Sequence, residues 1–177
     1  MTVSTMFHFI ATGDHKLMRK LNNWSAPQWI RWWAVAASRG GDGWIWYLFG
    51  VIVLLFGGRT RLPALASAGS AAAIGVAIFI SLKRVSGRKR PCEIEPHCWA
   101  KLLPPDRFSF PSGHTITAFA VAVAFGLFYP SLRPALLFCA ISIALSRIVL
   151  GMHFMSDVLA GAAIGSGLAF ASYVVFV

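Results

Sequence analysis

Long apolar blocks alternate with short polar stretches along this chain. Five of the blocks carry almost no charge, and they lie at 43–58, 62–82, 113–129, 134–150 and 158–177. An α-helix needs about 20 mainly apolar residues to cross the hydrocarbon layer of a bilayer. The pattern therefore predicts an all-α fold, a polytopic transmembrane bundle with five clear spanning helices.

The N-terminal part follows a different pattern. Leu17, Leu21 and Trp24 recur at helical spacing among basic side chains, which predicts an amphipathic helix over 14–38 lying along the membrane surface. The tryptophan-rich stretch 24–38 is also a candidate for a sixth span, although tryptophan beside arginine is typical of the membrane–water interface.

No linker or soluble module separates the predicted helices, so we expect one domain over 1–177. It would consist of an interfacial region at 1–42 and a spanning bundle at 43–177. One substantial polar insertion, 83–110, links the second and third predicted spans. Polar insertions of this length are usually functional, so the loop is where we expect part of a site.

The composition supports a membrane protein. Hydrophobic residues make up 57% of the 177 residues and charged residues 12%, which is more apolar surface than a soluble domain of this size can bury. The net charge of +10 would also suit nucleic acid. The cations stand beside apolar spans, however, so we expect anionic lipid and no nucleic acid as the partner.

Few ionisable residues lie near the predicted spans, and those that do are functional candidates because charge is costly at membrane depth. His153 precedes Asp157 by four residues, so on a helix the two side chains would meet and the carboxylate could accept a hydrogen bond from the imidazole. The other ring nitrogen would then be a nucleophile. Arg147 offers a planar fork for phosphate oxygens, and Gly151 allows the chain to bend.

A second cluster stands where the polar insertion meets the third predicted span. Pro111 suits a first helical turn, and Ser112 and Gly113 would lie beside its free N–H groups, which bind anions. His114 follows and could exchange a proton with a leaving oxygen.

The third cluster comprises Lys83 and Arg90, which are cations at the membrane boundary. The neighbouring Arg84, Arg88 and Lys89 are interpreted as electrostatic anchors to anionic lipid.

Together the three clusters resemble the signature of the type 2 phosphatidic acid phosphatase (PAP2) superfamily. The matching residues are Lys83-x6-Arg90-Pro91, Pro111-Ser112-Gly113-His114 and Ser146-Arg147-x5-His153-x3-Asp157. They span 83–157, with all parts in order and at the right spacing.

The resemblance implies a role for each matched residue. His153 would attack phosphorus, Asp157 would orient it, and His114 would protonate the departing oxygen. The phosphate oxygens would be held by Lys83, Arg90, Ser112, Gly113 and Arg147. The reaction would be metal-independent hydrolysis of a lipid phosphate monoester or diphosphate through a phosphohistidine, with no cofactor.

The substrate type stays open among phosphatidylglycerophosphate, phosphatidic acid and polyprenyl phosphate or diphosphate. The same residues are also compatible with two other functions. An acceptor other than water would make the protein a lipid phosphotransferase or headgroup-exchange enzyme, and a protein without the chemistry would bind or transport lipid.

The predicted topology departs from the family pattern in the number of spans. Membrane proteins of this superfamily usually have six spans, whereas five are predicted here, so the oligomeric state stays open and a homo-oligomer is one possibility. Every Lys and Arg except Arg59, Arg61 and Arg133 falls on the predicted side of the site, which favours the cytoplasmic face of a bacterial inner membrane. The resemblance favours the outer face.

A disulfide between Cys92 and Cys98 would require an oxidising compartment, and a zinc site with His97 is the alternative for this pair.

Overall fold

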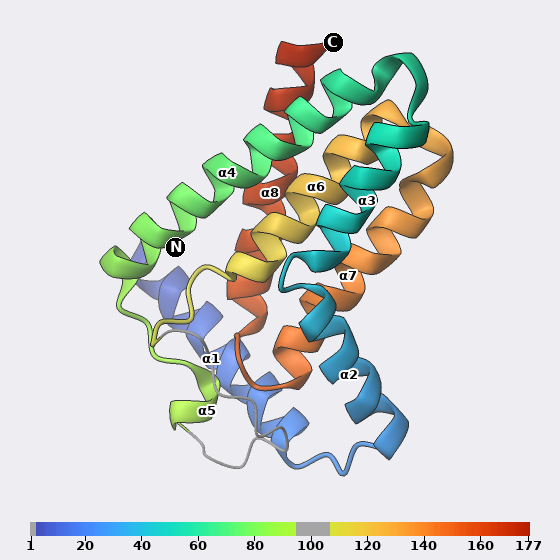
Figure 1. The fold of residues 1–177 in the computed structure, drawn as a ribbon. Helices are drawn as coiled ribbons and strands as arrows, with labels where there is room; N and C mark the ends of the chain where they lie inside the picture. Colours follow the sequence, from blue (N-terminus) through green and yellow to red (C-terminus); the bar gives the residue numbers. More distant parts are fainter. Residues whose placement is uncertain (1–2, 95–106) are drawn as a thin grey trace.

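The computed structural model describes residues 3–94 and 107–177, and this part of the chain is helical (Figure 1). The α-helices are α1 (Val3–Asn22), α2 (Gln28–Gly40), α3 (Trp44–Phe56), α4 (Arg61–Ser86), α5 (Pro91–Ile94), α6 (Gly113–Phe128), α7 (Arg133–Val149) and α8 (Met155–Phe176). Single 3-10 turns at Gly58–Thr60 and Pro130–Leu132 precede α4 and α7. Within the described residues the one β contact is an isolated bridge between Lys89 and Phe108.

Helix α6 lies at the centre of the bundle, where it packs against α4, α7 and α8. Its inward positions are mostly small, with Ala118, Ala120, Ala122 and Ala124 all fully buried. Small side chains let helix backbones approach closely, which is the usual way helices associate inside a membrane. The all-α prediction is therefore confirmed for the described residues, and small residues form the centre of the bundle.

Two glycines on α8 set its distance from α6. A Cβ on Gly161 would lie 2.9 Å from the carbonyl oxygen of Ser112, and one on Gly165 would lie 2.4 Å from that of Ile116. No side chain fits at these positions unless the helices separate. This glycine pair thus packs within the bundle and holds α8 against the start of α6.

Among the residues that the structure describes, three helices are long and apolar enough to span a membrane, at Gly58–Ser86, Pro130–Val149 and Met155–Phe176. The pair α2 and α3 would make a fourth span if its two helices, bent by 59° at their junction, count as one. Helix α6 is apolar but shorter. Each predicted apolar block is thus helical, and the count of five spans stays a prediction.

The single amphipathic helix predicted over 14–38 is wrong. The chain leaves helix α1 after Asn22 and re-enters helix at Gln28, directly after Pro27. Proline cannot continue a preceding helix but suits the position before a new one, which explains the break. Helix α1 packs against the start of α8, whereas α2 packs against α7.

Four chain segments meet at one end of the bundle, at the lower side of Figure 1. The last turn of α4, the start of α6, the end of α7 and the start of α8 all lie there, with α1 and α2 beside them. The three predicted clusters belong to these segments.

Replacing Gly165 with alanine tests the packing of α8 on α6. Gly167→Ala is a matched control on the same helix, because a Cβ there meets nothing within 4 Å. Both changes raise helix propensity by up to about 1 kcal/mol, but only Gly165→Ala forces the helices apart, at a cost of about 1–3 kcal/mol. We expect a lower thermal midpoint in detergent for Gly165→Ala alone. Equal midpoints would contradict the packing described.

Candidate active site

His153 lies in the turn that joins α7 to α8. The backbone N–H groups of Met152 and His153 both donate to the carbonyl oxygen of Arg147, at 3.0 and 3.1 Å, so the chain folds back over the end of α7. Gly151 makes this possible with a φ of +66°, a conformation that favours glycine. The expectation that His153 shares a helix with Asp157 is therefore wrong, because α8 begins only after Phe154.

The two ring nitrogens of His153 have different partners. Nδ1 lies 2.7 Å from the carbonyl oxygen of Ser109 and 3.7 Å from Oδ2 of Asp157. Because a carbonyl can only accept, Nδ1 carries the proton and Nε2 carries the lone pair. The expected acceptor, Asp157, is thus the more distant of the two. Its Oδ2 instead accepts from the N–H of Phe154 at 2.8 Å and closes the first turn of α8.

Arg90 occupies the other side of the imidazole. Its Nη1 lies 3.2 Å from Nε2 of His153 and donates to the carbonyl oxygen of Met152 at 2.8 Å. Both side chains are buried. A guanidinium that is already beside the lone pair of Nε2 is well placed to bind an anion arriving there.

Burial keeps the imidazole of His153 uncharged. Burial lowers its pKa to about 4, and the positive charges of Arg90 and Arg147 act in the same direction against the raising effect of Asp157. The ring is therefore neutral at physiological pH, which is the form that can attack as a nucleophile.

His114 is the second residue of α6, and it contacts a residue that the sequence analysis missed. Its Nε2 lies 2.9 Å from Oδ1 of Asp42, which stands in the junction between α2 and α3. The charges of Arg147 and Lys83 also act on His114. One sequence signal was available, since Asp42 is one of only six acidic residues in a strongly basic chain.

Arg147 is the group that the two histidines share. Its charge acts on both His114 and His153, and its side chain is buried at the end of α7. Nη1 donates to the hydroxyl of Ser38 on α2. Helix α2, expected to be a surface element, therefore supports a side chain of the site.

The remaining predicted residues lie around the start of α6 and the end of α4. The N–H of Ser112 donates to the carbonyl oxygen of Asp157 at 3.2 Å, which joins the second cluster to the third, and its hydroxyl accepts from Thr115 at 2.9 Å. Gly113 begins α6, close against the ring of Phe79. Lys83 is buried in the last turn of α4, with Nζ 5.2 Å from the centre of the same ring.

Arg88 was interpreted as a lipid anchor, and that interpretation is wrong. Its Nη1 lies 2.7 Å from Oδ1 of Asp157 and its Nη2 lies 2.7 Å from Oδ2 of Asp14. Arg84 and Lys89 are exposed, and their role as lipid anchors stays a prediction. The contact of Arg88 depends on the docking of α1, which no local pattern around Arg88 indicates.

Comparison with known proteins assigns the family. The PAP2 superfamily model matches residues 62–177. The chain belongs to the PAP2 superfamily. Among its relatives, the lipid A 1-phosphatase of Rhizobium johnstonii is 33% identical over 151 residues, which cover 74% of this chain and 62% of that protein. The decaprenylphosphoryl-5-phosphoribose phosphatase of Mycobacterium tuberculosis is 32% identical over 136 residues, 75% of either chain.

Solved PAP2 structures share the fold. Aquifex aeolicus LpxE superposes with a TM-score of 0.75 at 27% identity, over 89% of this chain and 92% of that one. The PAP2-type phosphatidylglycerolphosphate phosphatase of Bacillus subtilis gives 0.71 at 24% identity, over 92% and 84%. The apolar helices and these relatives identify an integral membrane protein. The chain spans about 62% of the length of the Rhizobium johnstonii relative.

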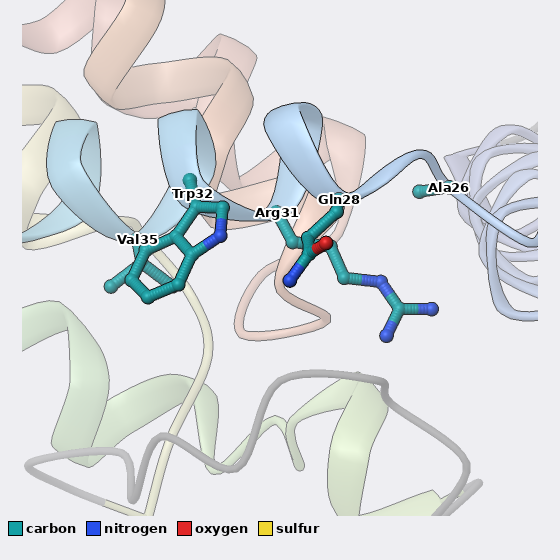
Figure 2. Close-up of a pocket in the computed structure, with 5 residues that line it drawn as sticks. All are labelled: Ala26, Gln28, Arg31, Trp32 and Val35. Carbon is teal, nitrogen blue, oxygen red and sulfur yellow. The ribbon is translucent and has the colours of Figure 1, made fainter.

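Beyond the PAP2 motifs, a hollow of about 420 Å³ lies along α2 and is lined by Ala26, Gln28, Arg31, Trp32 and Val35. Figure 2 shows the last four projecting from the same side of the helix. An amide, a guanidinium and an indole thus gather beside the helix that carries Ser38.

The His, Cys, Asp and Glu side chains bear on the predictions about metals and thiols. Within residues 3–94 and 107–177, no group of three or more His, Cys, Asp or Glu side chains is arranged to hold a metal ion. The Cys92/Cys98 disulfide and the zinc alternative with His97 depend on residues outside the described part of the chain, and both stay predictions.

The lowered pKa of His153 makes stability depend on pH. Below about 6.5 the unfolded chain binds a proton at this imidazole, whereas the folded protein does so only near pH 4. The folded state should therefore lose about 3 kcal/mol as pH falls through this window and no more from this group below it. Thermal unfolding is measured in detergent from pH 7 to pH 4. The thermal midpoint should fall less steeply with pH for His153→Gln than for the parent protein. Parallel declines would contradict the burial of a neutral ring.

Proposed function

We propose that this protein is a lipid phosphatase that hydrolyses a phosphate ester or diphosphate through a phosphohistidine at His153. The observation that supports it best is the neutral, buried imidazole, with its Nδ1 proton held by Ser109 and its Nε2 beside Arg90. The names of the relatives support the same reaction class.

In the first step the lone pair of Nε2 attacks phosphorus, and the bond from phosphorus to the lipid oxygen breaks. His114 gives its proton to that oxygen, so the lipid leaves as an alcohol, or as a monophosphate if the substrate is a diphosphate. Arg90, Arg147 and Lys83 hold the charged oxygens, with help from Ser112 and the N–H of Gly113. Such preorganised cations and N–H groups stabilise the charge that develops during transfer.

In the second step water attacks the phosphohistidine. His114, which lost its proton in the first step, takes a proton from this water. The bond between phosphorus and Nε2 breaks, and the bonding electrons return to the imidazole of His153. Inorganic phosphate leaves. Asp157 offsets the positive charge that the imidazole carries while it is phosphorylated. The residues named supply the nucleophile, the proton and the cations, so the proposal requires no metal ion.

An apolar groove suits the lipid part of the substrate. A cavity of about 360 Å³ lies between α3 and α4 over α6, and its lining includes Gly43, Trp46, Gly69 and Thr117. Gly43 directly follows Asp42, the partner of His114, and Thr117 is one helical turn beyond His114. A chain in this groove would thus have its phosphate end near the site.

The relatives' names add two substrates to those expected from the motifs. Lipid A and decaprenylphosphoryl-5-phosphoribose therefore join phosphatidylglycerophosphate, phosphatidic acid and polyprenyl phosphates as candidates. The hollow along α2 offers Trp32, Arg31 and Gln28, residue types that bind polar headgroups at the membrane surface.

The membrane arrangement belongs to the same proposal. Helices α3 and α6 would complete five spans, and the cations gathered at the site end would place that end in the cytoplasm of a bacterial cell by the positive-inside rule. Labelling of Cys92 in intact cells by a reagent that cannot cross membranes would contradict this orientation.

The purified protein should release inorganic phosphate from at least one of these lipids in the presence of a chelator. His153→Ala should lower the rate by about 10⁴-fold or more, because it removes the nucleophile. Phosphate release and transfer to an added lipid alcohol are measured side by side, since transfer without release would indicate a phosphotransferase. A strict requirement for magnesium, or an active His153→Ala, would overturn the mechanism.

Filling the groove should weaken binding of long lipids only. A Cβ at Gly69 meets nothing within 4 Å, so Gly69→Leu should extend into the groove without a clash. Displacing two methylenes of the substrate costs about 1.6 kcal/mol, or roughly tenfold in KM. Gly167→Leu is the control outside the groove. The same change in KM for a short, water-soluble phosphate ester would show that the groove does not hold the chain.

A further inference from the structure

Behind Asp157 lies a charged network that the proposed mechanism does not use. Arg88 bridges two carboxylates, with 2.7 Å from Nη1 to Oδ1 of Asp157 and 2.7 Å from Nη2 to Oδ2 of Asp14. The Asp157 side chain is fully buried and that of Asp14 is 4% exposed, whereas that of Arg88 is 26% exposed. Two buried carboxylates therefore share one guanidinium.

Asp14 belongs to α1 and connects that helix to the start of α8. Its Oδ1 accepts from the N–H of Ser156 at 3.1 Å, and its Oδ2 accepts from the hydroxyl of the same residue. The guanidinium of Arg88 lies over the ring of Phe154, 4.1 Å from its centre, and His15 packs on that ring at an edge. Helix α1 thus contacts Phe154 and Ser156, which lie just before Asp157 in the sequence.

The charges in this network determine what Asp157 offers to the imidazole. Arg88 alone would neutralise the carboxylate of Asp157. Asp14 offsets the charge of Arg88, so the three side chains together leave one net negative charge beside His153. A phosphorylated imidazole is positive, and a nearby negative charge in a buried site favours its formation.

We propose that Asp14 and Arg88 are positioning residues for Asp157, and that docking of α1 thereby supports formation of the phosphohistidine. This inference rests on the proposed function. Arg88 fixes Oδ1 while the N–H of Phe154 fixes Oδ2, and Asp14 keeps the negative charge of Asp157 available to the ring. In this view α1 is part of the active site and more than a membrane anchor.

A set of charge variants tests the proposal. Asp14→Asn leaves Arg88 to neutralise Asp157, so kcat should fall by about tenfold to fiftyfold, the effect of one unit charge at several ångströms in a partly buried site. KM should stay nearly unchanged, since the phosphate-binding cations are intact. The double variant Asp14→Asn with Arg88→Gln restores one net negative charge and should recover part of kcat. Lys16→Gln, an exposed change on α1, should match the parent.

The double variant shows whether Asp14 and Arg88 act through their charges or only hold the structure together. If it is as slow as Asp14→Asn or slower, the two residues only hold α1 in place and the proposal is overturned. Should Asp14→Asn fail to fold, Arg88→Lys serves, because an ammonium cannot bond both carboxylates as the planar fork does. A lower kcat at unchanged KM supports the proposal, and parental kcat overturns it.

His153→Ala is assayed in parallel. If the parent and His153→Ala release phosphate equally, the proposed function fails. If His153→Ala is inactive while Asp14→Asn matches the parent, only the inference about α1 fails.

Discussion

The site depends on the hydrogen bond from Nδ1 of His153 to the carbonyl oxygen of Ser109, which joins two buried residues. This bond fixes the tautomer, and burial keeps the ring neutral. The lone pair of Nε2 must therefore point toward Arg90. A backbone acceptor is suited to this task because it is always in the same protonation state, whereas a carboxylate would titrate with the ring.

Close helix packing makes this arrangement possible. Gly161 brings α8 near the start of α6, where the N–H of Ser112 donates to the carbonyl oxygen of Asp157. The second and third sequence clusters are thereby joined through backbone atoms. Membrane helices gain little from hydrophobic attraction to one another, so small residues and backbone contacts determine how precisely such a site is assembled.

The sequence predicted the features that local patterns encode. Apolar blocks indicated the helices, and the spacing of Arg90, His114 and His153 indicated the family. The break at Pro27 also had a local signal, which the recurrence of Leu17 and Leu21 outweighed. Tertiary contacts could not be predicted from the sequence. The acceptor for His153 is a main-chain oxygen that no side-chain pattern reveals, and the roles of Asp42 and Arg88 depend on which helices meet.

The basic residues at the end of α4 and just after it are a second case in which tertiary contacts could not be predicted. Arg84, Arg88 and Lys89 are neighbours in one basic run, and the sequence gives no reason to separate them. In the fold, Arg88 turns inward because Asp14 and Asp157 form a buried acidic pair that needs a cation, while the other two face outward. Unpaired charges are costly in such a place, so the acidic partners decide which arginine is buried.

The most direct test of the account is to look for the covalent intermediate. The purified protein would be mixed with a lipid carrying a labelled phosphate and quenched in alkali, and the labelled residue located by mass spectrometry. We expect an alkali-stable, acid-labile phosphate on His153 that forms and decays at least as fast as turnover. Label on another residue, or full turnover with no labelled protein under any quench, would contradict nucleophilic attack by this imidazole.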